Sequence, residues 1–152
     1  MTDIRRLHKL VWDTRRELGE AWPTPEPIDA LRFALTEAGE AMDAWLRTNP
    51  LYRRNNEKTL SVHAELADCA MMLLTALGPE IDVAEMSVEP ANLETICLHV
   101  ANICNDAANY GKLLNHCRWW TCRTVAAIGA YPGMDLPAEL TARLARIMQK
   151  HG

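Results

Sequence analysis

The chain has 152 residues, of which 49% are hydrophobic and 24% are charged. This length and composition suit one globular domain over residues 1–152 and exclude a disordered or fibrous chain. The formal net charge of −4 offers no general attraction for a nucleic acid polymer or an anionic membrane surface. No apolar run reaches the roughly 18 residues that cross a bilayer, and the first residues lack the apolar core of a secretory signal. We therefore expect a cytoplasmic protein that binds neither membrane nor nucleic acid polymer.

The hydrophobic pattern predicts helices throughout, because apolar residues recur near every 3.6 positions and no alternating strand pattern is present. In chain order, the predicted helical segments are 2–22, 28–48, 59–77, about seven turns within 89–116, 117–131, and a last helix after Asp135. Proline-rich or glycine-containing segments separate several of them, with Pro27 opening the second helix and Asp135 capping the last. The predicted fold is all-α, an antiparallel helical bundle with a four-helix core.

The cysteines give no metal or disulfide signature. There are five, an odd number, and no two of them form a C-x-x-C pair. The sequence therefore predicts neither a disulfide framework nor a zinc site, and free cysteines of this kind usually pack as small core residues.

Two acidic pairs stand within otherwise apolar helical segments. Glu37 and Glu40 lie on the second predicted helix, and Glu65 and Asp68 lie on the third. Residues three apart on a helix are separated by about 60° around the axis and about 4.5 Å along it, so each pair projects from one face. A hairpin of these helices would bring four carboxylates together, and divalent cations are the usual remedy for the repulsion.

The carboxylates provide only oxygen ligands, which favour Mg²⁺, with Mn²⁺ as a substitute, over zinc or copper. Such ions often complete their shell with phosphate oxygens, so a phosphorylated substrate is indicated. One alternative is that each pair is a solvated helix face. Another is a ferritin-like di-iron site, but that site needs Glu-x-x-His on two helices, and His63 lies two residues before Glu65 and so faces elsewhere.

The spacing of these acids resembles a family motif. An E-x-x-E at Glu37 and Glu40, followed after 24 residues by an E-x-x-D at Glu65 and Asp68, is similar to the signature of the MazG-like all-α nucleotide pyrophosphohydrolases, which include the dimeric dUTPases. The N-terminal run "RLHKLVWDTRRELGEAWPTPEP" also resembles the opening of that family. The resemblance covers roughly residues 5–85.

The resemblance implies Mg²⁺-dependent cleavage of a nucleoside triphosphate between the α and β phosphorus atoms, which yields a nucleoside monophosphate and pyrophosphate. It also implies that Glu37, Glu40, Glu65 and Asp68 are metal ligands. A glutamate of this set would prepare the attacking water, and Glu37 is our choice for that role.

The chain departs from the family in two places. Thr36 stands where the family commonly has a further acid, and after the second motif only Asn92 stands in for the usual basic residue and asparagine. Residues 90–150 match no short family member. We expect them to complete the bundle, with the hairpin of residues 90–130 as a degenerate internal duplication and with His99 and Asn102 where an acidic pair once stood. The alternative is that extra helices simply cover the core.

A triphosphate needs further polar partners. The predicted phosphate contacts are basic residues at the loop end of the acidic hairpin: Arg47, Arg53, Arg54 and Lys58. The predicted base or sugar contacts lie on one face of the fourth helix: Asn102, Asp106 and Asn109. For both sets the alternative is a solvated polar surface, and the five tryptophans are either stacking platforms or core residues.

The competing hypothesis for the whole chain is a non-catalytic bundle that binds a nucleotide or a protein partner. The oligomeric state stays open at this point, because a self-contained core permits a monomer, whereas exposed apolar positions on outer helices would suit a homodimer.

Overall fold

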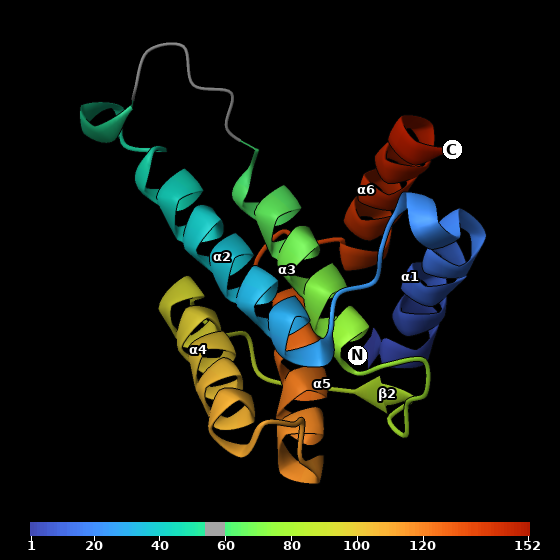
Figure 1. The fold of residues 1–152 in the computed structure, drawn as a ribbon. Coiled ribbons are helices and arrows are strands. Elements are labelled where there is room, and N and C mark those ends of the chain that lie inside the picture. Colours follow the sequence, from blue (N-terminus) through green and yellow to red (C-terminus); the bar gives the residue numbers. More distant parts are fainter. Residues whose placement is uncertain (54–59) are drawn as a thin grey trace.

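The computed structural model describes residues 1–53 and 60–152, so Arg54 and Lys58, two of the predicted phosphate contacts, lie outside the described residues. The helical elements are α1 (Ile4–Leu18), η1 (Gly19–Ala21), α2 (Pro27–Leu46), η2 (Pro50–Tyr52), α3 (Val62–Ala76), α4 (Leu93–Tyr110), α5 (Asn115–Gly129) and α6 (Leu136–His151). Two short strands are β1 (Thr2–Asp3) and β2 (Glu85–Met86). The all-α prediction is confirmed (Figure 1).

Helices α2 and α6 begin at the predicted start signals, whereas α3 begins at Val62 rather than near residue 59. Pro27 occupies the first turn of α2, and the Asp135 carboxylate accepts a hydrogen bond from the backbone N–H of Ala138 at 3.2 Å. At the start of α3, the Ser61 hydroxyl accepts from the Ala64 N–H at 3.1 Å. These contacts satisfy backbone donors that a helix leaves unpaired at its N-terminus.

The N-terminal region differs from the prediction in two details. The first α-helix ends at Leu18 rather than near residue 22, and η1 follows it. The chain also forms an antiparallel strand pair, with Thr2 opposite Met86 and Asp3 opposite Glu85. A two-residue strand is too short to produce the alternating pattern by which strands are detected in a sequence.

The core is centred on α3. Every residue of this helix from Ala64 to Ala76 is buried, and the helix packs against α2, α6, α5 and α1. Figure 1 shows α3 between α2 and α6, with α4 on the far side of α2. The predicted hairpin of α2 and α3 is therefore present. Residues from each of the α-helices α1 to α6 join one buried hydrophobic cluster. The four-helix core and the internal duplication stay predictions.

Apart from the fully buried Leu31, the buried face of α2 is made of small residues, which lets its neighbours approach its backbone closely. Its fully buried alanines are Ala30, Ala34, Ala38 and Ala41. The close approach of α4 is visible at Cys97, whose thiol donates to the carbonyl of Ala38 at 3.4 Å. Small residues on this face place the larger acidic side chains of α2 directly beside α3.

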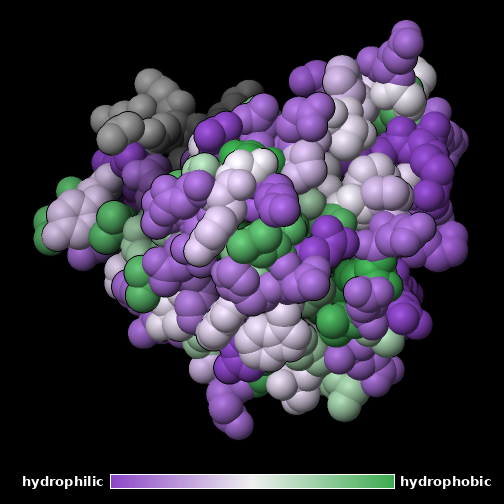
Figure 2. Space-filling model, turned by 60° about the horizontal axis from the view of Figure 1, so that its bottom comes forward, coloured by the Kyte–Doolittle hydropathy of each residue, from purple (hydrophilic) through white to green (hydrophobic). Residues whose placement is uncertain are grey.

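The surface carries no broad apolar band on the face that Figure 2 shows, where hydrophobic residues form small groups between hydrophilic ones. Within residues 1–53 and 60–152, no helix combines the length and the apolar character that crossing a membrane requires.

Candidate metal centre

Three of the four predicted carboxylates come together between α2 and α3. Glu37 lies in the middle of α2, while Glu65 and Asp68 lie in the first two turns of α3. One carboxylate oxygen from each lies within 4.8 Å of the other two. Glu65 and Asp68 are only 7% and 5% exposed. The interpretation of these α3 acids as a solvated face is therefore wrong, because both are buried in the core.

Glu40 lies at the rim of this group. Its side chain is exposed, and it does not belong to the set of oxygens within 4.8 Å. Its negative charge still acts on Glu37 and Glu65, because both side chains lie within its hydrogen-bonding and electrostatic range. The structure thus places three acids in the cluster and the fourth beside it.

One buried oxygen of the cluster has no partner. Oε2 of Glu65 is fully buried and accepts no hydrogen bond from the described residues. An unpaired buried carboxylate oxygen costs free energy, and coordination of a cation is one of the few ways to satisfy it. The residues present therefore fit a hard divalent cation with oxygen ligands.

The raised pKa values of the cluster carboxyls also favour a bound cation. The pKa of Glu37 is raised to about 9, first by burial and then by hydrogen bonding to Glu65 and by the charges of Asp68 and Glu40. Burial also raises the pKa of Glu65 and of Asp68. In the absence of a cation, Glu37 thus keeps a proton at neutral pH, and a divalent ion would supply the positive charge that permits full ionisation.

Arg143 of α6 joins the site, which the sequence analysis missed. Its guanidinium donates to both oxygens of Asp68, with Nε to Oδ1 at 2.7 Å and Nη2 to Oδ2 at 2.9 Å. The charge of Arg146 also favours the ionised form of Asp68, although burial prevails and the pKa of Asp68 is still raised. The signal in the sequence is a pair of arginines three apart on the last helix, but nothing local connects that helix to α3.

The predicted phosphate contacts that the structure describes lie at the loop end of the hairpin. Arg47 ends α2 and donates to both oxygens of Asp43, at 2.8 and 3.0 Å, and to the carbonyl of Tyr52 at 2.9 Å. Arg53 follows η2 and is exposed. Arg143, rather than either of these, is the arginine that contacts the carboxylate cluster.

Thr36 and His63 supply no further ligand to the cluster. Thr36 is exposed, and its hydroxyl donates to the carbonyl of Arg32 in the preceding turn at 3.1 Å. The Nε2 of His63 lies 3.0 Å from the carbonyl oxygen of Pro132. No histidine belongs to this group of ligand atoms in the part of the chain that the structure describes, which disfavours the di-iron alternative.

The predicted base or sugar contacts lie elsewhere. Asn102 and Asp106 line a cavity of about 370 Å³ whose lining residues come from α4 and α5. Asn109 is exposed one turn beyond Asp106 and does not line it. Because the carboxylate cluster belongs to α2 and α3, the structure does not bring the two predicted sets into one pocket.

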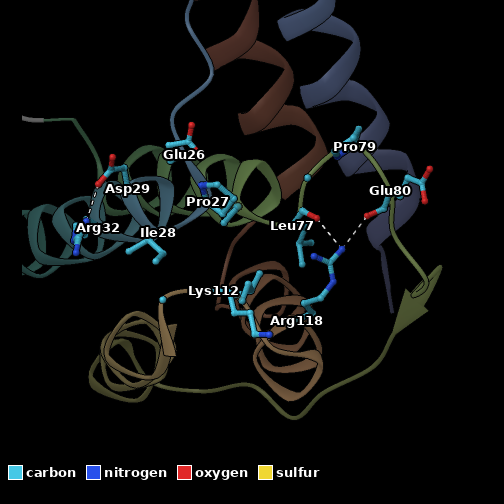
Figure 3. Close-up of a pocket in the computed structure, with 14 residues that line it drawn as sticks. Glu26, Pro27, Ile28, Asp29, Arg32, Leu77, Pro79, Glu80, Lys112 and Arg118 are labelled. Atoms are coloured by element: carbon cyan, nitrogen blue, oxygen red, sulfur yellow. Dashed lines mark hydrogen bonds and ion pairs between the residues drawn. The ribbon is translucent and has the colours of Figure 1, made fainter. Parts of the chain in front are cut away.

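A further cavity, of about 740 Å³, lies at the opposite end of the hairpin, between the start of α2, the end of α3 and the turn from α4 to α5. Figure 3 shows Arg118 at its edge, donating to the carbonyls of Leu77 at 2.8 Å and Glu80 at 3.3 Å. None of the predicted site residues that the structure describes lines this cavity. The candidate metal centre is therefore defined by its side chains rather than by the size of a pocket.

Comparison of the chain with protein-family models, with curated proteins and with solved structures finds no match.

Proposed function

We propose that the chain is a divalent-cation-dependent nucleoside triphosphate pyrophosphohydrolase, which converts a nucleoside triphosphate to the monophosphate and pyrophosphate. The observation that carries the proposal is the cluster of Glu37, Glu65 and Asp68, whose oxygens lie within 4.8 Å of one another. We infer the reaction from the spacing of these acids in the sequence, which resembles the MazG-like motif.

Glu37, Glu65 and Asp68 would hold Mg²⁺, or Mn²⁺ in its place, and Glu40 would add negative charge at the rim. The unpaired Oε2 of Glu65 supports this set, because the described residues give it no other partner. When bound, the cation supplies charge neutralisation and polarises the phosphate oxygens.

Glu37 would act as the general base. With a cation bound and Glu37 ionised, its carboxylate is the group of this set that we assign to accept a proton from water. The water oxygen forms a bond to the α phosphorus, the bond from that phosphorus to the α–β bridging oxygen breaks, and pyrophosphate leaves. Glu37 holds the proton taken from the water until it passes to solvent.

Arg143 would position Asp68 and place a positive charge beside the developing negative charge of the phosphates. Its two hydrogen bonds fix the orientation of the Asp68 carboxylate. Arginine presents a rigid fork of donors that matches carboxylate and phosphate oxygens equally well.

A second function is favoured by one observation. Both oxygens of Asp68 are already engaged by Arg143, and Thr36 adds no acid. A bundle that binds a nucleotide without cleaving it would be consistent with this closed arrangement.

The two functions separate in one assay. With Mg²⁺ present, the parent chain should release pyrophosphate from at least one member of a panel of canonical and modified nucleoside triphosphates. Glu65→Gln and Asp68→Asn should abolish release, whereas Glu17→Gln, at an exposed position on α1, should match the parent. Nucleotide binding without product across the panel would favour the non-catalytic function. Turnover that survives Glu65→Gln would refute this site.

A further inference from the structure

A second group of possible metal ligands lies between α4 and α5. Asp106 belongs to the C-terminal half of α4, and His116 and Cys117 belong to the first turn of α5. The Nε2 of His116 lies 3.4 Å from the Cys117 Sγ and 3.9 Å from Oδ2 of Asp106. All three ligand atoms lie within 4.8 Å of one another.

The turn between the two helices makes this arrangement possible. Helix α4 ends at Gly111, which adopts a left-handed conformation with φ of 70°. Glycine takes this conformation without the penalty that a side chain would bring. The chain then reverses, so that the start of α5 lies beside the last turns of α4, with which it packs.

The distances suit tetrahedral zinc. Zinc binds nitrogen and oxygen at about 2.0–2.2 Å and sulfur at about 2.3 Å, so neighbouring ligands in a tetrahedron are separated by about 3.3–3.8 Å. The separations of His116 Nε2 from its two neighbours, 3.4 and 3.9 Å, already lie close to that range. Small side-chain rotations therefore suffice to bring the three donors onto one ion.

The donor set distinguishes this group from the carboxylate cluster. A thiolate, an imidazole and a carboxylate select a borderline-soft ion such as Zn²⁺ over Mg²⁺. No C-x-x-C spacing announces the group, since its ligands come from two helices.

A cavity adjoins the three donors. The space of about 370 Å³ between α4 and α5 is lined by both Asp106 and Cys117. His99 lines it as well, and its Nδ1 is buried with no hydrogen-bond partner among the described residues. Three protein ligands leave the fourth zinc position for a water or a small ligand, and this cavity gives that ligand room.

We propose that Asp106, His116 and Cys117 form a zinc site whose fourth position faces the cavity between α4 and α5. On binding, the Cys117 S–H bond breaks, a Zn–S bond forms and the proton passes to solvent. This site goes beyond the proposed hydrolysis, because it uses a different ion and none of the carboxylates of α2 and α3.

The test is titration of chelator-treated full-length chain with Zn²⁺ in excess Mg²⁺, followed calorimetrically, and with Co²⁺, followed by absorption. We expect one Zn²⁺ per chain, and for Co²⁺ the charge-transfer band of a cobalt–thiolate bond. Removing a group that only hydrogen-bonds to a metal ligand already weakens metal binding about 10–100-fold. Because Asp106 and His116 would bind the ion directly, Asp106→Asn and His116→Gln should each weaken Zn²⁺ binding at least about tenfold. Cys117→Ser should abolish the cobalt band.

Two controls separate this site from other ligands. Cys97→Ser, at a half-buried cysteine of α4 that is not in the group, should keep both signals. Glu65→Gln should also keep them, so the zinc site and the proposed hydrolase can fail independently. Should Cys117→Ser not fold, Asp106 and His116 still test the site, because their side chains are 49% and 55% exposed. Absence of Zn²⁺ binding, or binding that Asp106→Asn and His116→Gln leave unchanged, would overturn the proposal.

Discussion

Arg15 is a buried cation without a carboxylate partner among the described residues. The residue is 3% exposed, its Nε donates to the Thr75 hydroxyl at 3.0 Å, and Nη1 has no partner. Burial lowers its pKa to about 10. The guanidinium lies 3.8 Å from the ring centroid of Trp22, a contact worth roughly 1–2 kcal/mol that offsets part of the desolvation cost.

Replacing this cation with an apolar side chain of similar length should therefore be tolerated. We expect Arg15→Met to keep the free energy of unfolding within about 1 kcal/mol of the parent, or to raise it, because the unpaired charge is removed. Arg15→Ala should lower it by about 2 kcal/mol or more, because it also leaves a cavity. Urea denaturation measures both. Equal losses in the two variants would show that the charge itself stabilises the fold.

Glu37 should make the stability of the metal-free chain depend on pH. Its pKa is about 9 in the folded chain and 4.5 ordinarily, so between these values the folded state retains a proton that the unfolded state releases. Stability should accordingly fall as the pH rises through this interval, with the loss complete above about 9. Thermal unfolding in the presence of a chelator measures the trend.

Glu37→Gln is the control for this dependence, because an amide does not titrate. It should flatten the fall in melting temperature, although the raised pKa values of Glu65 and Asp68 contribute to a fall of the same sign. A chelator-treated parent chain whose melting temperature rises across the interval would contradict the raised pKa of Glu37.

At the scale of the elements, α3 should contribute most to stability because it is buried on every side. Leu73, in the C-terminal half of α3, is fully buried, whereas Leu51 of η2 is 84% exposed. We expect Leu73→Ala to lower the free energy of unfolding by about 2–5 kcal/mol, and Leu51→Ala to change it by about 0.5 kcal/mol or less. Comparable losses in chemical denaturation would argue against a core centred on α3.

Helix α6 is tied to α3 by the ion pair of Arg143 with Asp68. Because Asp68 is buried, Arg143→Ala should cost about 3 kcal/mol by leaving an uncompensated carboxylate. Adding Asp68→Asn should recover part of that loss, since the buried charge is then removed as well. Lys150→Ala, at an exposed position near the end of α6, is the matched control. Additive effects of the Asp68 and Arg143 changes in a double-mutant cycle would disprove the coupling.

The sequence predicted the elements more fully than their arrangement. Periodicity, Pro27 and Asp135 located the helices, because these signals are local. The strand pair at Thr2 was not predicted, since its partner is more than eighty residues away. The central place of α3 was not predicted either. Its nearly continuous apolar run indicates burial but does not say which helices surround it.

For the molecule as a whole, some residues of the candidate site could be predicted from the sequence and others could not. Glu37, Glu65 and Asp68 were predictable, because acids on the facing sides of successive helices of a hairpin come together, although the fourth acid, Glu40, lies at the rim. Arg143 was not, because 75 residues separate it from Asp68 and only the packing of α6 on α3 brings them together. Asp106 was predicted as a base or sugar contact, and its proximity to His116 and Cys117 depends on the turn at Gly111.

The homodimer stays a prediction. Several large apolar side chains are exposed on the outer faces of α2 and α5: Phe33, Leu35, Trp45, Leu46, Trp119 and Trp120. Isolated exposed apolar residues are common on monomers, so this distribution does not decide the oligomeric state.

The carboxylates of α2 and α3 should bind a divalent cation in solution. Titration of chelator-treated chain with Mn²⁺ tests this binding, with free Mn²⁺ followed by electron paramagnetic resonance and one equivalent of Zn²⁺ per chain already bound. We predict that Mn²⁺ binds the parent and Glu17→Gln, that Mg²⁺ competes with it, and that Glu65→Gln and Asp68→Asn weaken binding at least about tenfold. Equal Mn²⁺ binding by the parent and Glu65→Gln, or none by the parent, would contradict the account.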